Sequence, residues 1–211
     1  YGQVSGDYYD FFQLDDKSQA FLLADVSGHG VPAALMTMTL KEKFGLYAQL
    51  LRDPAEMFRL LNEKISAMFE TGGFRPRYFS GFYMIIDSDN IMSYCNAGHP
   101  HPLVISENGT MTTLESEGGV VGMFSSMGTY YHTSKIQLKQ GDRIVLITDG
   151  IIEAMNENDE QYGWERLINS LQDSSNLTIS ETVQRIISGL DRFTDIEKLH
   201  DDATIIGIEV L

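Results

Sequence analysis

One apolar run constrains the fold of this chain more than any other segment, because it ends abruptly in a glycine turn. Residues 19–26 (QAFLLADV) are mostly apolar, and the turn 27–30 (SGHG) follows them directly. This pattern is typical of a buried β-strand that stops at a tight turn. Pro32 then stands where the first turn of a helix accepts proline. The segment therefore predicts a strand, a turn and a helix in immediate succession.

Two consecutive helices are expected after this turn, from about residue 31 to 51 and from residue 53 to 71. Apolar residues recur at helical spacing in both segments. Asp53, with Glu56 three positions later, is the predicted N-cap of the second helix. The apolar positions with this spacing are Leu35, Met38, Leu40, Phe44 and Tyr47 in the first helix and Met57, Leu60, Leu61, Ile65 and Met68 in the second.

The remaining sequence consists largely of short β-rich runs separated by turn residues, which is typical of antiparallel hairpins. The runs between residues 78 and 114 are expected to form one meander. Strands with helices grouped between them, rather than in strict alternation, predict an α+β layered fold. The predicted strands span residues 78–87, 91–96, 103–106, 111–114, 133–138, 143–148 and 203–210, and the later helices span residues 163–171 and 179–193.

Composition and charge narrow the classes of partner and location. With 211 residues, 43% of them hydrophobic, the chain is expected to form a single domain over residues 1–211. The formal net charge of −15 disfavours binding to nucleic acid or to anionic lipid, and no apolar run approaches the roughly 18 residues of a membrane span. One cysteine, Cys95, permits no internal disulfide, which fits a cytoplasmic protein. Because the chain begins at Tyr1 without methionine, we expect it to be the C-terminal part of a longer regulatory protein.

Acidic residues share one feature at four sites: each lies at an end of a predicted strand, beside glycine or another polar turn residue. These sites are Asp7, Asp25, Asp149 and the pair Asp201-Asp202. Singly, an Asp-Gly pair is foremost a turn signal. Together, such carboxylates can bind hard cations such as Mg²⁺ and Mn²⁺, which take oxygen ligands from distant parts of a chain. Two ions about 3.5–4 Å apart can share a water and aim it at a phosphorus atom. The residues predict this chemistry but do not name the substrate.

Five short motifs occur in a fixed order along the chain. They are residues 5–11 (SGDYYDF), 24–30 (ADVSGHG), 96–100 (NAGHP), 148–150 (TDG) and 201–204 (DDAT). In this order they closely resemble the PPM-type phosphatases of the bacterial stage II sporulation protein E class, and the match covers nearly the whole chain. The resemblance implies an α-β-β-α sandwich of two antiparallel sheets flanked by helices. It also implies a protein serine/threonine phosphatase in sigma-factor regulation, whose substrate is a phosphorylated anti-sigma-factor antagonist.

The resemblance assigns metal-binding roles to residues near the start of the chain. Asp25 is expected to bridge two Mn²⁺ or Mg²⁺ ions, with the backbone carbonyl of Val26 beside it. Asp7 is expected to bind metal directly or through water. Two features depart from the family: Ser5 replaces the usual glycine and is expected to stiffen the turn, and most of the preceding strand is missing from the chain. No arginine stands near this motif to clamp a phosphate.

The resemblance also assigns Asp149 and Asp201 as ligands of the other metal, with Asp202 orienting Asp201. Asp25 and Asp149 are therefore the residues on which catalysis is expected to depend most. His29, between two glycines, can donate a proton to the leaving alkoxide, or it can hydrogen-bond within the turn.

Two further histidines and the first helix carry weaker hypotheses. His99 and His101 flank Pro100, but without a third ligand nearby we interpret them as structural rather than as a transition-metal site. A sensor or dimerisation segment ahead of the domain is expected to act through the helix pair. The responding surface is then Leu35, Met38 and Leu46, whose alternative role is ordinary core.

Two other functions remain open at this point. One is a dimetal hydrolase that acts on small phosphate esters. The other is a module that keeps the fold for signalling or binding and has no catalytic activity. Retention of all four aspartates argues against the second, because loss of a metal ligand is the simplest route to an inactive relative.

Overall fold

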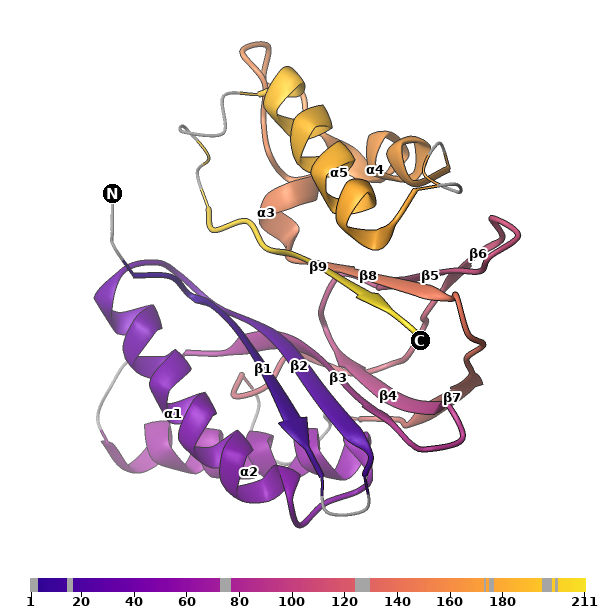
Figure 1. Cartoon of the computed structure of the whole chain (residues 1–211). Coiled ribbons are helices and arrows are strands. Elements are labelled where there is room, and N and C mark those ends of the chain that lie inside the picture. The colour runs from indigo at the N-terminus through magenta and orange to yellow at the C-terminus, as the bar shows by residue number, and fades with distance from the viewer. Residues whose placement is uncertain are drawn as a thin grey trace. The chain divides into compact units, whose positions relative to one another are not determined.

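The computed structural model describes residues 4–14, 17–72, 77–123, 130–172, 174, 177–194, 199 and 201–211. The chain divides into two compact units, the first formed by Tyr1–His99 with Glu115–Leu138 and the second by Pro100–Leu114 with Lys139–Leu211. Each unit has one antiparallel sheet and its own helices (Figure 1). The α+β class with two antiparallel sheets is therefore confirmed. That residues 1–211 form a single domain stays a prediction.

The sheet of the first unit has five strands in the order β1-β2-β3-β4-β7, and every neighbouring pair is antiparallel. The apolar run that predicted a buried strand forms β2, which lies between β1 and β3 and is buried along most of its length. The bounds are Asp7–Gln13 for β1, Gln19–Val26 for β2, Phe79–Ile86 for β3, Ile91–Ala97 for β4 and Ser134–Gln137 for β7.

Two helices cover this sheet, α1 (Val31–Ala48) and α2 (Pro54–Gly72). Helix α1 packs against β1 and β2, while α2 packs against β3 and β4. In the core between them, the rings of Phe44 and Tyr83 meet edge to face with centroids 4.8 Å apart. The predicted N-cap of α2 is confirmed, since the Asp53 carboxylate accepts a hydrogen bond from the backbone N–H of Ala55 at 2.8 Å.

Helix α1 buries only some of its apolar residues. Leu40 and Phe44 are buried, but Leu35 and Met38 are exposed by 65% and 63%, and Leu46 by 56%. The alternative role of Leu35, Met38 and Leu46 as ordinary core is therefore wrong. Apolar residues surround this helix, so their spacing does not select a face, and the small side chains of its alanines allow close approach to the sheet. The residues that α1 buries are Ala33, Met36, Leu40, Phe44 and Ala48.

The sheet of the second unit has the order β6-β5-β8-β9, again antiparallel throughout. Helix α5 packs against β9 and α4, and its apolar face joins that of α4 in a core with β5 and β8. The bounds are Leu103–Ile105 for β5, Met111–Thr113 for β6, Arg143–Ile147 for β8, Ile205–Glu209 for β9, Asp149–Ile152 for α3, Gly163–Gln172 for α4 and Ile179–Phe193 for α5.

The predicted single meander between residues 78 and 114 is wrong. Strands β3 and β4 pair in the first sheet, whereas β5 and β6 pair in the second. Between the two hairpins, Gly98 adopts a φ of 70°, and Pro100 and Pro102 supply no N–H for a ladder. These residues end the pairing after β4, whose other edge pairs with β7 instead. Among the described residues, no helix has the length and apolarity needed to cross a membrane.

Candidate metal-binding site

Two of the proposed ligands, Asp7 and Asp25, stand directly opposite each other on neighbouring strands. Asp7 begins β1, and Asp25 is its partner near the end of β2 in the antiparallel register. Directly opposite residues place their side chains on the same face of a sheet, with Cβ atoms about 5 Å apart. Both residues are half-buried. The register therefore brings two carboxylates to one end of the sheet of the first unit.

The turn before Asp7 leaves no room for a side chain on Gly6. A Cβ atom on Gly6 would lie 3.0 Å from the carbonyl oxygen of Val26 and 3.2 Å from that of Gly28. The Gly6 carbonyl also accepts a hydrogen bond from the Val26 N–H at 3.2 Å. Ser5 adds a second restraint, because its hydroxyl accepts a hydrogen bond from the Asp7 N–H at 3.0 Å. The expectation that Ser5 stiffens this turn agrees with that geometry.

The loop after Asp25 is tied to the residues that enter β3. The Ser27 N–H donates to the Tyr78 carbonyl at 2.9 Å, and the Tyr78 N–H donates to the Ser27 hydroxyl at 3.2 Å. The Arg77 guanidinium donates to the Ser27 carbonyl at 2.5 Å. No sequence pattern predicts this contact, because Arg77 lies far from the first two motifs along the chain. His29 is exposed and makes no hydrogen bond to the residues that the structure describes.

In the second unit, Asp149 is the first residue of α3, a short helix that the sequence did not predict. The preceding residue, Thr148, is buried and exchanges two hydrogen bonds with Thr204: its N–H donates to the Thr204 carbonyl at 3.0 Å, and its hydroxyl accepts from the Thr204 N–H at 2.9 Å. A Cβ atom on Gly150 would lie 2.1 Å from the Asp202 carbonyl oxygen. These contacts place the backbone of Asp149 against the segment that carries the last motif.

Asp201 lies at the rim of a pocket in this second unit, with a volume of about 190 Å³. Its carboxylate is exposed and accepts a hydrogen bond from the Asp202 N–H at 2.9 Å. The pocket is lined by Gly150, Glu153, Ala154, Met155, Thr194, Leu199 and Asp201. Carboxylates and apolar side chains thus share one concave surface.

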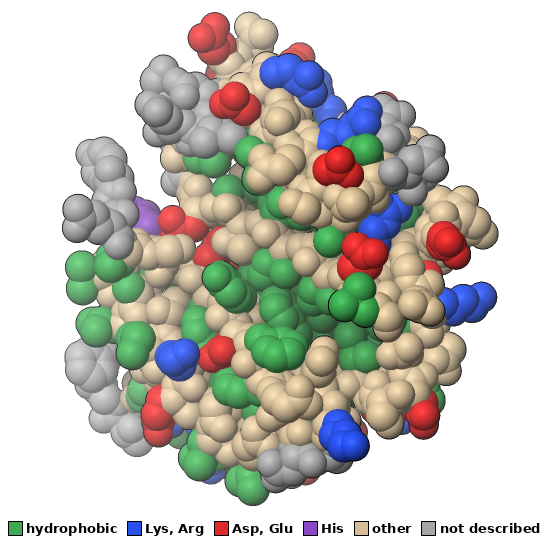
Figure 2. All heavy atoms as spheres, viewed as in Figure 1, with side chains coloured by type: hydrophobic (Ala, Val, Ile, Leu, Met, Phe, Trp, Pro, Cys, Tyr) green, Lys and Arg blue, Asp and Glu red, His purple; other side chains and the backbone are tan. Residues whose placement is uncertain are grey.

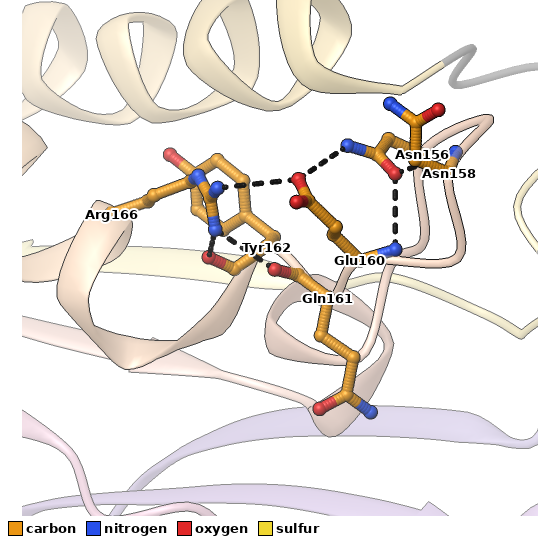
Figure 3. Close-up of polar contacts among 6 residues, drawn as sticks. All are labelled: Asn156, Asn158, Glu160, Gln161, Tyr162 and Arg166. Carbon is orange, nitrogen blue, oxygen red and sulfur yellow. Dashed lines mark hydrogen bonds and ion pairs between the residues drawn. The ribbon is translucent and has the colours of Figure 1, made fainter.

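A polar loop follows the pocket residues Ala154 and Met155 along the chain (Figure 3). The Asn156 side-chain oxygen accepts hydrogen bonds from the N–H groups of Asn158 and Glu160, at 2.9 and 3.0 Å. Arg166 donates to the carbonyl of Gln161 at 3.0 Å, so helix α4 holds the other end of the loop. The carbonyl of Met155, a lining residue, accepts from the Thr194 hydroxyl at 2.6 Å.

The contacts of His99 suggest that its side chain supports the local structure. It is buried, and its Nδ1 lies 2.8 Å from the Ser80 hydroxyl. Its backbone exchanges hydrogen bonds of 2.7 and 2.8 Å with the Asn96 side chain. His101 is exposed. This geometry agrees with the interpretation of both histidines as non-ligands.

The paired carboxylates of the first unit suit a hard divalent cation in their chemistry. Among the described residues, no group of three or more His, Cys, Asp or Glu side chains is arranged to hold a metal ion. Asp7 and Asp25 belong to the first unit, and Asp149 and Asp201 belong to the second. Mg²⁺ commonly binds through only one or two carboxylates and keeps several waters, and carboxylate oxygens suit Mn²⁺ as well. The pair of Asp7 and Asp25 therefore fits these ions in number and chemistry.

Comparison with known proteins decides the family. The family model described as Stage II sporulation protein E (SpoIIE) matches residues 15–211. The chain belongs to this family. Among its SpoIIE-family relatives, the phosphoserine phosphatase RsbU of Bacillus subtilis is 31% identical over 97% of this chain and 59% of its own length. The phosphoserine phosphatase RsbP of the same organism is 26% identical over 99% of this chain and 50% of its own length. The chain thus spans little more than half the length of these relatives.

Solved structures show the same SpoIIE-type fold. The SiaA-PP2C domain of Pseudomonas aeruginosa matches with a TM-score of 0.82 and 22% identity, covering 99% of this chain and 82% of that domain. The phosphatase domain of SpoIIE from Bacillus subtilis, solved with a fragment of its regulatory domain, matches with a TM-score of 0.77 and 15% identity over 99% of this chain and 59% of that one. RsbX, solved in complex with magnesium, matches with a TM-score of 0.65 and 20% identity, covering 98% and 87% of the two chains.

Proposed function

We propose that this SpoIIE-family chain is a protein serine/threonine phosphatase that uses two Mn²⁺ or Mg²⁺ ions. The observation that carries the proposal is the direct pairing of Asp7 with Asp25 at one end of the first sheet. An aspartate with a purely structural role at a strand end does not need a second carboxylate opposite it, because like charges at that position repel. A metal ion bound between the two carboxylates would offset this repulsion, and the family relationship points to phosphate ester hydrolysis.

The proposed roles follow from the resemblance of the motifs to the family. Asp25, the Val26 carbonyl and Asp7 are the proposed metal ligands of the first unit. Asp149 and Asp201 are the proposed ligands of the second unit, and Asp202 would orient Asp201. The ions, when bound, supply a water whose pKa is lowered towards neutrality and neutralise charge on the phosphate.

His29 is the proposed proton donor to the leaving alkoxide. Its side chain is exposed in the loop directly after Asp25 and Val26, so a bound phosphoprotein can reach it. Histidine is the side chain that most often serves as a general acid in catalysis, which suits this role.

The proposed substrate is a phosphorylated anti-sigma-factor antagonist in the bacterial cytoplasm. RsbU and RsbP, the relatives compared above, are themselves phosphoserine phosphatases. The chain carries a net charge of −15, and Glu153 and Asp201 line the pocket of the second unit. Both features favour a phosphoserine with basic or neutral surroundings.

The deciding experiment measures phosphate release from a phosphorylated antagonist domain and from p-nitrophenyl phosphate, each with Mn²⁺ and with a chelator. We expect metal-dependent release from the phosphoprotein, and none from the Asp25→Asn variant. Release from the small ester alone would instead support a hydrolase of small phosphate esters. No release from any substrate, despite Mn²⁺ binding, would support a non-catalytic signalling module.

Charge preference provides a separate test of the substrate proposal. In a phosphoserine peptide series with Lys, Ala or Glu beside the phosphoserine, we expect the Lys peptides to be the best substrates. Glu153→Lys should remove most of this preference, because it cancels the negative charge that Glu153 and Asp201 together give the pocket. Glu157→Lys is the matched control, since Glu157 is exposed nearby but does not line the pocket. An unchanged preference in Glu153→Lys would contradict the role of the pocket.

We expect regulation of the proposed metal site to act through helix α1. The exposed residues Leu35, Met38 and Leu46 give this helix an apolar surface. Green hydrophobic side chains lie exposed in the region of α1 in Figure 2. Helix α1 begins directly after the loop 27–30, and its Lys41 pairs with Asp10 of β1 at 3.4 Å. We expect a sensor or dimerisation segment of the full-length protein to cover this surface and to raise metal affinity. Equal Mn²⁺ dependence of this chain and of a longer chain containing that segment would contradict the idea.

A further inference from the structure

Arg77 occupies a position that the proposed ligand set does not explain. It lies between α2 and β3, and its guanidinium Nη1 donates to the carbonyl oxygen of Ser27 at 2.5 Å. The same nitrogen lies 2.9 Å from the position that a Cβ atom on Gly28 would take. Gly28, with a φ of 82°, therefore gives the guanidinium close access to the backbone of the loop.

The loop held in this way carries the central proposed ligands. Ser27 follows Asp25 and Val26 directly, and its N–H shares one peptide group with the Val26 carbonyl. The bond from that N–H to the Tyr78 carbonyl therefore helps to orient the Val26 carbonyl. Arg77 restrains the next peptide group, which contains the Ser27 carbonyl. On one side, the Val26 N–H is bonded to the Gly6 carbonyl. On the other side, the Ser27 carbonyl is bonded to Arg77. The backbone around the ligands is thus restrained from both directions.

The charge of Arg77 makes this contact stronger than a neutral one. Hydrogen bonds from a guanidinium to an oxygen are roughly twice as strong as neutral bonds. A cation near a metal site would also repel the metal if it turned towards the ligands. The bond to the Ser27 carbonyl restrains the guanidinium at the loop backbone.

Arg77 also lines a groove of about 470 Å³ in the first unit. The other residues of this groove come mainly from α1 and α2 and are Pro32, Leu35, Met36, Thr39, Met68 and Phe69. One side chain therefore contacts both the helix groove and the loop that follows Asp25. A change in the groove can reach the loop through this guanidinium.

We propose that Arg77 is a positioning residue: it holds the Ser27 carbonyl so that Asp25 and the Val26 carbonyl keep the geometry that a divalent metal requires. This inference rests on the proposed metal-dependent function. Partners that orient metal ligands commonly change metal affinity by about 10- to 100-fold when they are removed. Arg77 acts on the loop backbone and is not itself a ligand.

The test compares Mn²⁺ binding, measured by calorimetry, in the 211-residue chain and in its Arg77→Ala, Arg77→Lys and Arg77→Gln variants. We expect Arg77→Ala to weaken Mn²⁺ binding by about tenfold or more. Arg77→Lys, which keeps a charged donor, should fall between wild type and Arg77→Ala. Added guanidinium ion should restore part of the affinity of Arg77→Ala. Arg77→Gln tests the need for charge and should resemble Arg77→Ala.

Arg52→Ala is the matched control. Arg52 also donates to backbone carbonyls, those of Ala48 and Gln49 at 3.0 Å, but it does so at the C-terminus of α1. We expect it to leave Mn²⁺ affinity unchanged. If Arg77→Ala fails to fold, Arg77→Lys and Arg77→Gln carry the comparison, and wild-type affinity in both would overturn the inference.

Two other results separate the possible failures. Wild-type Mn²⁺ affinity in Arg77→Ala, with a raised KM for phosphoprotein at saturating Mn²⁺, would make Arg77 a substrate contact and overturn the positioning role alone. No Mn²⁺ binding by the wild-type chain would overturn the proposed function together with this inference.

Discussion

The two units hold their proposed ligands by different means. In the first unit, Asp7 and Asp25 lie on paired strands, so the register of the ladder sets their separation. In the second unit, Asp149 begins a short helix and Asp201 lies in a segment outside the strands. There, backbone contacts replace the ladder, chiefly the bonds between Thr148 and Thr204. The comparison shows that carboxylate ligands can be positioned either by the register of a sheet or by close-packed turns. In the second case, their positions depend more on contacts made by single residues.

Removing the charge of one ligand in each unit should have the largest effect. We expect Asp25→Asn and Asp149→Asn to abolish phosphate release while the fold stays intact, because asparagine keeps the volume but removes a negative ligand. Circular dichroism and phosphate release measured on the same samples check this expectation. Near-wild-type activity in either variant would remove that unit from the proposed site.

Replacing Gly6 in the first unit and Gly150 in the second by alanine should show how differently the two units hold their proposed ligands. Gly150→Ala places a Cβ atom 2.1 Å from the Asp202 carbonyl, whereas Gly6→Ala places one 3.0 Å from the Val26 carbonyl. We expect Gly150→Ala to cost about 3 kcal/mol of unfolding free energy and Gly6→Ala about 1 kcal/mol, since overpacking costs grow with the displacement required. Urea denaturation of both variants measures the order. A larger cost at Gly6 would mean that the first unit depends more on its turn than its register suggests.

Loss of the Ser5 hydroxyl should have a smaller effect. Ser5→Ala removes the acceptor for the Asp7 N–H, a hydrogen bond of 3.0 Å. We expect a loss of about 1 kcal/mol in stability and a few-fold weaker Mn²⁺ binding. Thermal unfolding and calorimetry measure the two quantities. Unchanged Mn²⁺ affinity would show that the β1-β2 register alone is enough to position Asp7.

The helix caps of the two units should respond to acid in the same direction. Burial raises the pKa of Asp53, but hydrogen bonds from Thr133 and from the N–H groups that follow Asp53 outweigh it, so the net pKa lies below its usual value. In the second unit, hydrogen bonds from Thr178 lower the pKa of Glu181. A carboxyl group with a lowered folded-state pKa stabilises the protein above its unfolded-state pKa, and this stability is lost as pH falls through the folded-state value.

Asp53→Asn and Glu181→Gln should therefore reduce thermal stability at pH 7 and make less difference at acidic pH, below about 4. Melting temperatures across this range measure the effect, which we expect to be the smallest in this series because both groups are largely exposed. A difference from wild type that grows as the pH falls would contradict the assigned direction.

Local patterns predicted the elements whose signals lie within a few residues. Strand β2 and helix α5 have the expected bounds, and α5 carries a complete capping box between Thr178 and Glu181. The face of α1 could not be predicted, because apolar residues surround that helix and only the packed sheet selects among them. The division of the predicted meander between two sheets could not be predicted either, because the sequence pattern of a hairpin does not depend on which sheet the hairpin joins.

For the proposed site as well, local sequence patterns predicted candidate residues but not the contacts between segments that are distant along the chain. The motifs marked Asp7, Asp25 and Asp149 as residues beside turns, but the pairing of the first two depends on a register that only folding sets. The contact between Arg77 and Ser27 joins segments 50 residues apart, and no motif contains both. Sequence patterns can therefore name candidate ligands, whereas the residues that hold those ligands in place require the fold.

The hydrogen bonds between Thr148 and Thr204 also determine which parts of the second unit can accept changes in sequence length. Strands β8 and β9 pair with Ile147 opposite Ile205, so the chain leaves and re-enters the sheet at neighbouring points. Everything between these points, including α3, α4 and α5, forms an excursion whose base is closed by the two threonines. Insertions or deletions at the outer loops of this excursion can be accommodated without shifting the strand register. Evolution and protein engineering can thus change the outer surface of this excursion while Asp149 and Asp201 stay anchored at the base.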